Sequence, residues 1–291
     1  MEKGLIILKK IAWIGTGVMG SKMLKHLYKE YKLNIYNRTY KKALALKDYG
    51  NIYDNIIDCI KDCDYVISIV GYPNDVLDIY DVIIKNAKKN TILIDMTTSS
   101  PTLAKNIYHK ALDNSLFFLD APVTGSDIGA TNHSLSIMVG GDYDIFLKSL
   151  PIFNLLGKTI TYMGDSGNGQ NMKLTNQIVI ASNISGIAEA ITFAKYKKLD
   201  LNKVINVIEG GSANSWQAVN NGRKMINKDY EPGFYIKHFL KDLKLVFEEK
   251  DYLKLPIMEK VKDIYEKLNN DYYDKGTQYI IEYYLKINNL V

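Results

Sequence analysis

The residue types and spacing most suited to catalysis occur in Gly167-Asn-Gly-Gln-Asn-Met-Lys173-Leu-Thr-Asn176. Lys173 and Asn176 are three residues apart, so a helix would put both side chains on one face. A lysine among Met, Leu, Ile and Val is costly to bury unless it is paired or functional. Burial and a nearby cation lower the pKa of such an amine and suit it to protonate a developing alkoxide. The alternative is a lysine whose stem is buried and whose ammonium reaches water.

A second polar segment, Asp120-Ala-Pro-Val-Thr124-Gly125-Ser126, follows a predicted strand at 116–119. Its Pro-containing turn leads into backbone N–H groups and two hydroxyls, which suit a carboxylate or a small hydroxyl-bearing acid. We therefore expect Thr124, Gly125 and Ser126 to bind substrate, and a plain turn is the alternative.

The start of the chain has the pattern of a dinucleotide-binding turn. An apolar strand at 11–14 leads into Gly15-Thr16-Gly17-Val18-Met19-Gly20, and a helix-forming segment follows. Such a turn lets the backbone approach a pyrophosphate, and the helix N-terminus favours its negative charge. Two further loops, containing Val70-Gly71 and Thr98, follow later strands and should border the nicotinamide half of the cofactor.

The end of the second predicted strand indicates which dinucleotide is bound. Cofactors that lack a 2′-phosphate usually meet an Asp or Glu about 20 residues beyond the glycines. This chain has Asn37, Arg38 and Thr39 there. Arginine is a forked donor for a phosphate, so the pattern favours NADP(H) over NAD(H). A solvated arginine after a strand is the alternative.

These loops need a framework that brings strand ends together. Residues 1–165 alternate apolar strands with helices, which predicts an α/β Rossmann domain with a doubly wound, mostly parallel sheet. Residues 166–291 read as an all-helical domain that begins with a long interdomain helix. The strands are predicted at 11–14, 33–36, 65–70, 91–94, 116–119 and 135–139, and the helices of the first domain at 19–31, 40–48, 54–61, 75–85 and 101–112.

Composition limits the partners. The chain has 291 residues, 47% of them hydrophobic, and a net charge of +5 with lysines interleaved among acids, which does not indicate nucleic-acid binding. Cys59 and Cys63 have no neighbours that complete a metal set, so we expect buried thiols and no metal. The sequence predicts no signal peptide and no apolar run that approaches membrane-spanning length, so we expect a soluble cytoplasmic protein without a membrane partner.

Taken together, these motifs resemble the β-hydroxyacid dehydrogenase family, which includes 3-hydroxyisobutyrate dehydrogenase and tartronate semialdehyde (2-hydroxy-3-oxopropionate) reductase. The resemblance covers essentially the whole chain and also includes Ile137-Met-Val-Gly-Gly141 and Lys241-Asp242-Leu243. It implies a Rossmann domain joined to a helical domain, an NADP(H)- or NAD(H)-dependent reaction on a small carboxylate-bearing substrate, and a homodimer or homotetramer formed through the helical domain.

The resemblance also implies roles for individual residues. Lys173 matches the family's catalytic lysine, and Asn176 matches the asparagine that orients substrate. Thr124 and Gly125 match the loop that binds the substrate carboxylate, and Thr98 matches a threonine near the nicotinamide. Phe234 and Lys241 match positions of the helical domain that pack on the cofactor or reach toward it.

The chain departs from the family pattern at four positions. Ser126 and His133 stand where glycine is usual, Thr124 where serine is common, and Gln177 where a second asparagine is frequent. An imine reductase-like enzyme and a non-catalytic dinucleotide-binding protein are alternatives, but their relatives usually lack the lysine. The helical part is short for a 6-phosphogluconate dehydrogenase.

Overall fold

The computed structural model describes residues 8–290, which form two compact units divided between Lys173 and Leu174. The boundary lies inside one long helix, α8 (Asn168–Tyr196). The sequence predicts the domain boundary between residues 165 and 166, which lie in the turn that precedes this helix. Each unit has a hydrophobic core of its own.

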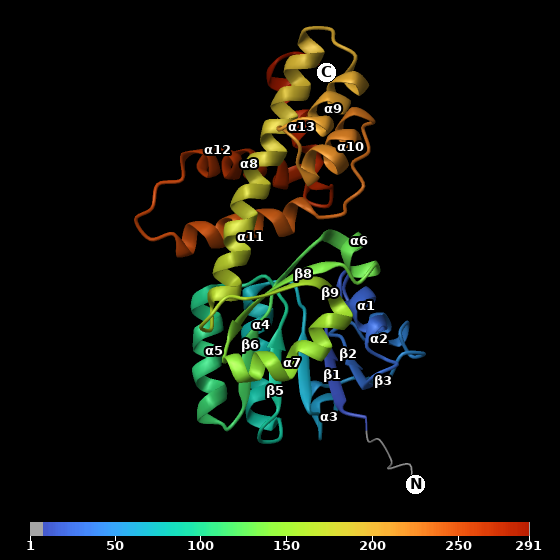
Figure 1. Ribbon diagram of the computed structural model, residues 1–291, viewed down its shortest axis with the longest axis vertical. Coiled ribbons are helices and arrows are strands. Elements are labelled where there is room, and N and C mark those ends of the chain that lie inside the picture. The colour runs from blue at the N-terminus through green and yellow to red at the C-terminus, as the bar shows by residue number, and fades with distance from the viewer. Residues whose placement is uncertain (1–7, 291) are drawn as a thin grey trace. The chain divides into compact units, whose positions relative to one another are not determined.

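The first unit is built on one mixed sheet of nine strands (Figure 1). Its order is β3-β2-β1-β4-β5-β6-β8-β7, with β9 paired to β8. The strands from β3 to β6 are parallel, and β8 runs antiparallel to β6. The bounds are β1 Lys10–Ile14, β2 Lys32–Tyr36, β3 Asn51–Tyr53, β4 Tyr65–Ser68, β5 Ile92–Asp95, β6 Phe117–Asp120, β7 Val123–Thr124, β8 Leu135–Gly141 and β9 Gly157–Tyr162.

The predicted α/β Rossmann class is confirmed, because this strand order reverses direction between β1 and β4. Loops that leave the carboxyl ends of strands at such a reversal surround a crevice where ligands bind. The strands β3, β7 and β9 were not predicted. They are short or half exposed, so they lack the apolar run that marks a buried strand.

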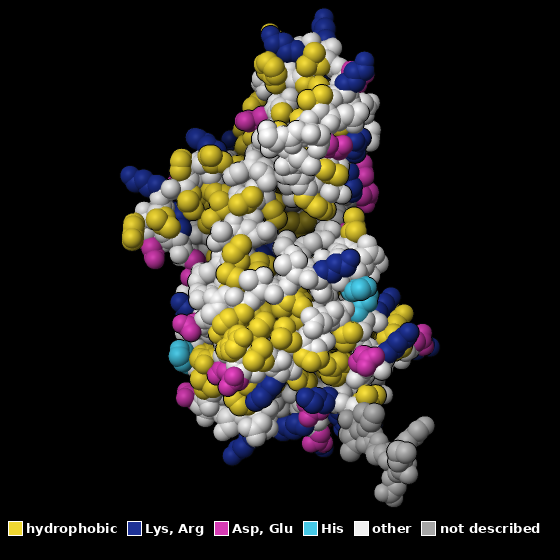
Figure 2. Space-filling view, viewed as in Figure 1, with side chains coloured by type: hydrophobic (Ala, Val, Ile, Leu, Met, Phe, Trp, Pro, Cys, Tyr) yellow, Lys and Arg dark blue, Asp and Glu magenta, His cyan; other side chains and the backbone are white. Residues whose placement is uncertain are grey.

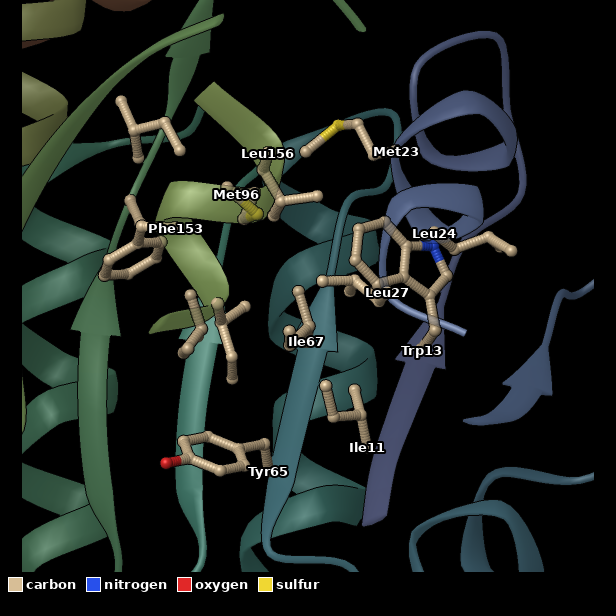
Figure 3. Packing of buried hydrophobic residues seen from close by; sticks show 14 of the residues in the cluster. Ile11, Trp13, Met23, Leu24, Leu27, Tyr65, Ile67, Met96, Phe153 and Leu156 are labelled. Atoms are coloured by element: carbon tan, nitrogen blue, oxygen red, sulfur yellow. The ribbon is translucent and has the colours of Figure 1, made fainter. Parts of the chain in front are cut away.

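Helices cover both faces of the sheet, as strand β1 shows. Ile11 and Trp13 pack into one apolar cluster, whereas Ala12 and Ile14 pack into another on the opposite face. Figure 3 shows the first cluster, in which the Trp13 ring lies beside Leu24 and Leu27. The helices and 3-10 turn of this unit are α1 Gly20–Met23, η1 Leu24–His26, α2 Tyr40–Leu44, α3 Ile56–Ile60, α4 Pro73–Asn86, α5 Pro101–Asp113, α6 Ser126–Thr131 and α7 Tyr143–Leu156.

One predicted helix is much shorter than expected. We expected residues 19–31 to be helical, but α1 ends at Met23 and continues only as the 3-10 turn η1. Leu27 and Glu30 then donate to carbonyls three residues back, which closes single turns before β2 begins at Lys32.

The thiols of Cys59 and Cys63 are buried and unbridged, as expected, and burial raises the pKa of Cys63 to about 11.

The regular elements of the second unit are helices, and Tyr235 and Gly276 form an isolated β-bridge between two of its loops. After α8 it contains α9 Leu201–Gly210, the π-helical segment η2 Gln217–Gly222, α10 Arg223–Ile226, α11 Ile236–Glu249, α12 Pro256–Tyr272, the 3-10 turn η3 Thr277–Tyr279 and α13 Ile280–Ile287. Its core is formed around Phe239, Tyr265 and Ile280.

The helix α8 is long, as the sequence predicted, and it is also apolar. By length and composition alone it could cross a membrane, with a mean hydropathy of 1.3 in its most apolar window, which contradicts our expectation that no apolar run approaches that length. Half of that window is buried within the protein, and a core helix of a globular protein passes the same test.

Figure 2 shows basic and acidic side chains interspersed on the face in view, in keeping with the interleaved charges of the sequence.

Polar side chains end the central parallel strands, and they are buried. Ser68, Asp95 and Asp120 pair in register at the carboxyl ends of β4, β5 and β6, and none is more than 2% exposed. The Asp95 carboxylate accepts hydrogen bonds from the Ser68 hydroxyl at 2.9 Å and the Thr97 backbone N–H at 3.1 Å. Burial nevertheless raises the pKa of Asp95 to about 6.

A pKa that is higher in the folded protein than in the unfolded chain makes stability depend on pH. The protonated Asp95 carboxyl contributes to the free energy of unfolding. This contribution is fully present below about pH 4 and is lost as the pH rises through about 6. Asparagine does not ionise, so the variant Asp95→Asn does not lose this stabilising contribution as the pH rises. We expect the free energy of unfolding of the variant, relative to wild type, to increase by roughly 1–3 kcal/mol between pH 4 and pH 7.

Urea denaturation at several pH values measures this difference. The matched control is Asp48→Asn, because Asp48 is an exposed aspartate of the same unit. A difference between Asp95→Asn and wild type that stays constant or shrinks as the pH rises would contradict the expectation.

Candidate active site

The glycine turn after β1 is shaped for close contact with a ligand. Gly15 has a φ of +102°, and a Cβ there would lie 2.1 Å from the Ile69 carbonyl oxygen. A Cβ on Gly20 would lie 2.3 Å from the Gly15 carbonyl oxygen, whereas a Cβ on Gly17 would meet no atom within 4 Å. Glycine is thus required at 15 and 20 by the fold, and at 17 the backbone faces open space.

One buried atom in this turn lacks a partner. Thr16 is 6% exposed, and its hydroxyl makes no hydrogen bond with any part of the chain that the structure describes. A buried hydroxyl left unpaired costs free energy. Phosphate oxygens beside an open Gly17 backbone would satisfy it, so the turn fits the pyrophosphate of a dinucleotide.

The Asn37 side chain ties this turn to the end of β2. Its Oδ1 accepts from the Thr16 backbone N–H at 2.9 Å, and its Nδ2 donates to the Thr39 carbonyl at 3.1 Å. Asn37 therefore supports the two loops that we expect to contact the cofactor. This supporting role was not foreseen from the sequence.

Arg38 is the cation at this edge. Its side chain is 83% exposed, and its guanidinium pairs with Asp75 Oδ1 at 2.7 Å. The other Asp75 oxygen accepts from the Tyr72 N–H at the start of α4. Because exposed ion pairs contribute only about 0–1 kcal/mol, a phosphate can compete for this guanidinium at small cost.

The loops after β4 and β5 are joined by hydrogen bonds. The backbone N–H of Val70 donates to the Thr97 hydroxyl at 3.0 Å, and Thr97 in turn donates to Asp95. Val70, Gly71 and Thr98 are half-buried. The predicted nicotinamide-side residues therefore lie on two neighbouring loops that are held together.

Asp120 holds the start of α8. Its Oδ1 accepts from the Gly167 N–H at 2.8 Å, and its Oδ2 accepts from the Gln170 N–H at 2.9 Å. The Ser166 hydroxyl donates to Oδ1 at 3.4 Å. Burial raises the pKa of Asp120 to about 6, and these hydrogen bonds oppose the rise. A carboxylate at a helix N-terminus is also favoured by the helix dipole.

Two glycines make this contact possible. A Cβ on Gly169 would lie 2.5 Å from the carbonyl oxygens of both Asp120 and Met138. A Cβ on Gly140 would lie 2.7 Å from Asp120 Oδ1. The first turn of α8 therefore lies directly against the ends of β6 and β8.

Lys173 follows on the next turn of α8 and is 6% exposed. Its burial argues against the alternative of a side chain that reaches into solvent. The Lys173 side chain interacts with other residues of the described chain. A buried lysine near a ligand crevice has the surroundings in which proton transfer is effective.

The predicted substrate loop has an unusual backbone. Gly125 has a φ of +135°, and Ser126 has a φ of +59°. His133, at the other end of α6, has a φ of +42°. Both positions where the family usually has glycine are thus left-handed here, which explains the usual glycine and makes Ser126 and His133 strained.

This loop is tied to the helix after the glycine turn. Lys22 of α1 forms an ion pair with Asp127 at 2.7 Å, and a ring nitrogen of His26 lies 2.9 Å from the Ala130 carbonyl oxygen. The His26 and His133 rings lie 5.5 Å apart. The candidate substrate loop and cofactor loop are therefore neighbours within the first unit.

The remaining candidate residues belong to the second unit. Asn176 Nδ2 donates to Gln177 Oε1 at 3.0 Å, and Gln177 Nε2 donates to Asp242 at 2.7 Å. Lys241 pairs with the other Asp242 oxygen at 2.8 Å. The candidates Asn176 and Lys241 are thus linked through two buried side chains, and the Phe234 ring packs edge-on against Phe239.

Sequence reasoning missed several of these supporting residues. Asp120, Asp242 and Gln170 lie within the motifs but were assigned no role, and Gln177 was recognised only as a departure from the family pattern. For Asp120 a signal was present, since a carboxylate that ends an apolar strand must be buried and needs donors. No comparable signal marked Gln170 as a residue with buried partners.

Relief of backbone strain at Ser126 is testable. A residue with a side chain costs roughly 1–2 kcal/mol in the left-handed region, and glycine avoids most of this cost. We expect Ser126→Gly to raise the free energy of unfolding by about 0.5–1 kcal/mol after the extra flexibility of glycine is allowed for. Thermal or urea unfolding measures it, with Ser134→Gly as the control because Ser134 has no left-handed φ. Equal destabilisation by both substitutions would refute the expected strain.

Comparison with known proteins identifies the family of this chain. Residues 10–164 match the NAD-binding domain of 6-phosphogluconate dehydrogenase, and residues 167–284 match the NAD-binding region of NADP-dependent 3-hydroxyisobutyrate dehydrogenase. Among relatives, an "Uncharacterized oxidoreductase YkwC" of Bacillus subtilis (strain 168) is 42% identical over 286 residues, covering 96% of this chain and 99% of the relative.

Two further proteins extend the comparison. The Arabidopsis thaliana protein named "Probable 3-hydroxyisobutyrate dehydrogenase-like 1, mitochondrial" is 40% identical over 290 residues, covering 97% of this chain and 86% of that protein. A structure of Mycobacterium tuberculosis 3-hydroxyisobutyrate dehydrogenase with L-serine matches with a TM-score of 0.88 and 27% identity, covering 95% of this chain and 99% of that one. The chain is therefore an oxidoreductase of the β-hydroxyacid dehydrogenase family.

Proposed function

We propose that this protein is an NADP(H)-dependent enzyme that interconverts a small β-hydroxyacid and its semialdehyde. The observation that carries the proposal is Lys173, a lysine with 6% exposure on a helix whose start is bonded to the carboxyl end of β6. Substrates of the 3-hydroxyisobutyrate, 2-hydroxy-3-oxopropionate and succinic semialdehyde types are the candidates. L-serine, named with the mycobacterial structure, is itself a small β-hydroxyacid, which supports this substrate class.

Each candidate residue has a defined task in this proposal. The bound nicotinamide supplies or accepts the hydride. In reduction, the Lys173 ammonium donates a hydrogen bond to the carbonyl oxygen and then gives its proton to the forming alkoxide. In oxidation, the neutral Lys173 amine takes the proton of the hydroxyl group.

Substrate position is the task of the other polar residues. The Thr124–Ser126 loop binds the carboxylate, and the Asn176 amide orients the group beside Lys173. Fixing the acid end brings the reacting carbon to a defined place and lowers the entropic cost of reaction. The family resemblance assigns Phe234 and Lys241 of the helical unit to cofactor binding.

The cofactor preference rests on Arg38. Its exposed guanidinium follows the second strand, where a ribose-binding carboxylate is absent, and Asp75 holds it with a weak surface ion pair. The unpaired Thr16 hydroxyl and the open backbone at Gly17 support a phosphate-bearing ligand in the adjoining turn. We therefore infer NADP(H) rather than NAD(H).

We also infer a homo-oligomer formed through the helical unit. Its helix α8 exposes large apolar side chains at Val179, Phe193 and Tyr196, each more than half accessible in the single chain. Exposed apolar patches of this kind are typical of interfaces between subunits.

Removing the Lys173 amine is the direct test of the reaction. We expect Lys173→Ala to lower kcat for semialdehyde reduction by about 10²- to 10⁴-fold, because the proton donor is lost, while NADPH binding stays within about twofold. Oxidation of NADPH is followed with succinic, methylmalonic and tartronic semialdehydes and glyoxylate, and binding is followed by cofactor fluorescence. The control Lys195→Ala removes a lysine from the other end of the same helix.

The outcomes separate the possible functions. Turnover that survives in Lys173→Ala would refute its role as proton donor. Tight NADPH binding by wild type without turnover of any aldehyde would favour imine substrates or a non-catalytic role.

Arg38→Ala tests the cofactor preference. A hydrogen bond to a charged group contributes about 1.5–3 kcal/mol, so we expect KM for NADPH to rise roughly 10- to 100-fold. KM for NADH should change less than about twofold, since that cofactor has no 2′-phosphate. The control Lys47→Ala removes an exposed charge just beyond α2. A wild-type preference for NADH, or equal effects on both cofactors, would refute the assignment.

A further inference from the structure

Gln170 is a fully buried amide one turn before Lys173, and it has 0% exposure. Its Oε1 accepts from the Ser99 backbone N–H at 2.9 Å, and its Nε2 donates to the Thr97 carbonyl at 2.7 Å. A glutamine amide has one acceptor and one donor end, so this side chain spans the backbone of both residues that flank Thr98.

The backbone of Gln170 is held as well. Its N–H donates to Asp120 Oδ2, and Gly167 donates to the other carboxylate oxygen. The first turn of α8 is therefore bonded to the end of β6 by its backbone and to the loop after β5 by a side chain. These two attachments restrain the first turn of α8 against rotation about the helix axis and against sliding along it.

The orientation of Lys173 follows from these attachments. Residues three apart on a helix lie on the same side, so Gln170 and Lys173 point toward the same region. Thr98 lies between the two residues that Gln170 binds. A displacement of about 1 Å between reacting groups can reduce a rate by about 100-fold.

We propose that Gln170 is a positioning residue that fixes the spacing between Lys173 and the loop carrying Thr98. The inference rests on the proposed function, because it assumes that Lys173 transfers the proton. Gln170 itself binds only backbone groups and needs no contact with substrate. Asp120 assists by holding the same helical turn.

The decisive variant is Gln170→Met, which has a similar shape and lacks both the acceptor and the donor. We expect kcat to fall about 10- to 100-fold and the affinity for NADPH to fall less than kcat, because Gln170 holds the Thr98 loop but makes no hydrogen bond with the described loops after β1 and β2. The primary deuterium isotope effect with 4-deuterated NADPH should increase, since the chemical step becomes slower. The control Asn171→Ala alters the next residue on the helix, which is exposed.

A second readout does not depend on turnover. Hydrogen exchange of the Ser99 amide should speed up in Gln170→Met and stay unchanged in Asn171→Ala. If wild type reduces no semialdehyde, the proposed function fails, while this exchange measurement still tests whether Gln170 holds the loop. Faster exchange with kcat and isotope effect unchanged would overturn the positioning role.

If Gln170→Met does not fold, the more conservative variant Gln170→Glu tests the same proposal. Its carboxyl keeps an acceptor for the Ser99 N–H, and when protonated it can also donate to the Thr97 carbonyl. We expect Gln170→Glu to keep more of the wild-type kcat than Gln170→Met and to show slower Ser99 exchange. Equal kcat in two folded variants that differ in Ser99 exchange would likewise overturn the proposal.

Discussion

The hydrogen bonds between Asp120 and the start of α8 are the constraint on which much of this structure depends. A carboxylate with 0% exposure would be strongly unfavourable alone, and its raised pKa reflects that cost. Two backbone N–H groups at a helix N-terminus would also be unpaired without it. The carboxylate accepts hydrogen bonds from these N–H groups, so both the buried charge and the backbone donors are paired. The 29-residue helix α8 is thereby attached to the end of β6.

The anchored turn also organises the loops around it. The loops after β4 and β5 and the end of β6 are joined in series by Val70, Thr97 and Gln170 through hydrogen bonds of 3.0 Å or less. Polar groups at the carboxyl ends of parallel strands would otherwise be exposed to a crevice with no fixed arrangement. Here they support each other, so the position of one loop depends on its neighbours.

The candidate residues are divided between the two units of the chain. The first unit contains the glycine turn, Arg38, the Thr124–Ser126 loop and Lys173, and the second contains Asn176, Phe234 and Lys241. The boundary falls between Lys173 and Leu174, so α8 connects the two groups covalently. Each unit holds its own candidates with buried polar networks, centred on Asp120 in one and on Asp242 in the other.

Local chemistry was sufficient to predict the Rossmann class, the glycine turn and the buried strands, because apolar periodicity and glycine spacing are properties of neighbouring residues. It was not sufficient for β3, β7 and β9, which form through pairing with strands already in place, or for the early end of α1. The positions that carry Ser126 and His133 were recognised as departures, but only the backbone angles explained them. The supporting roles of Asn37, Asp120 and Gln170 depend on partners 21, 47 and 71 residues away along the chain, so only the tertiary structure could decide them.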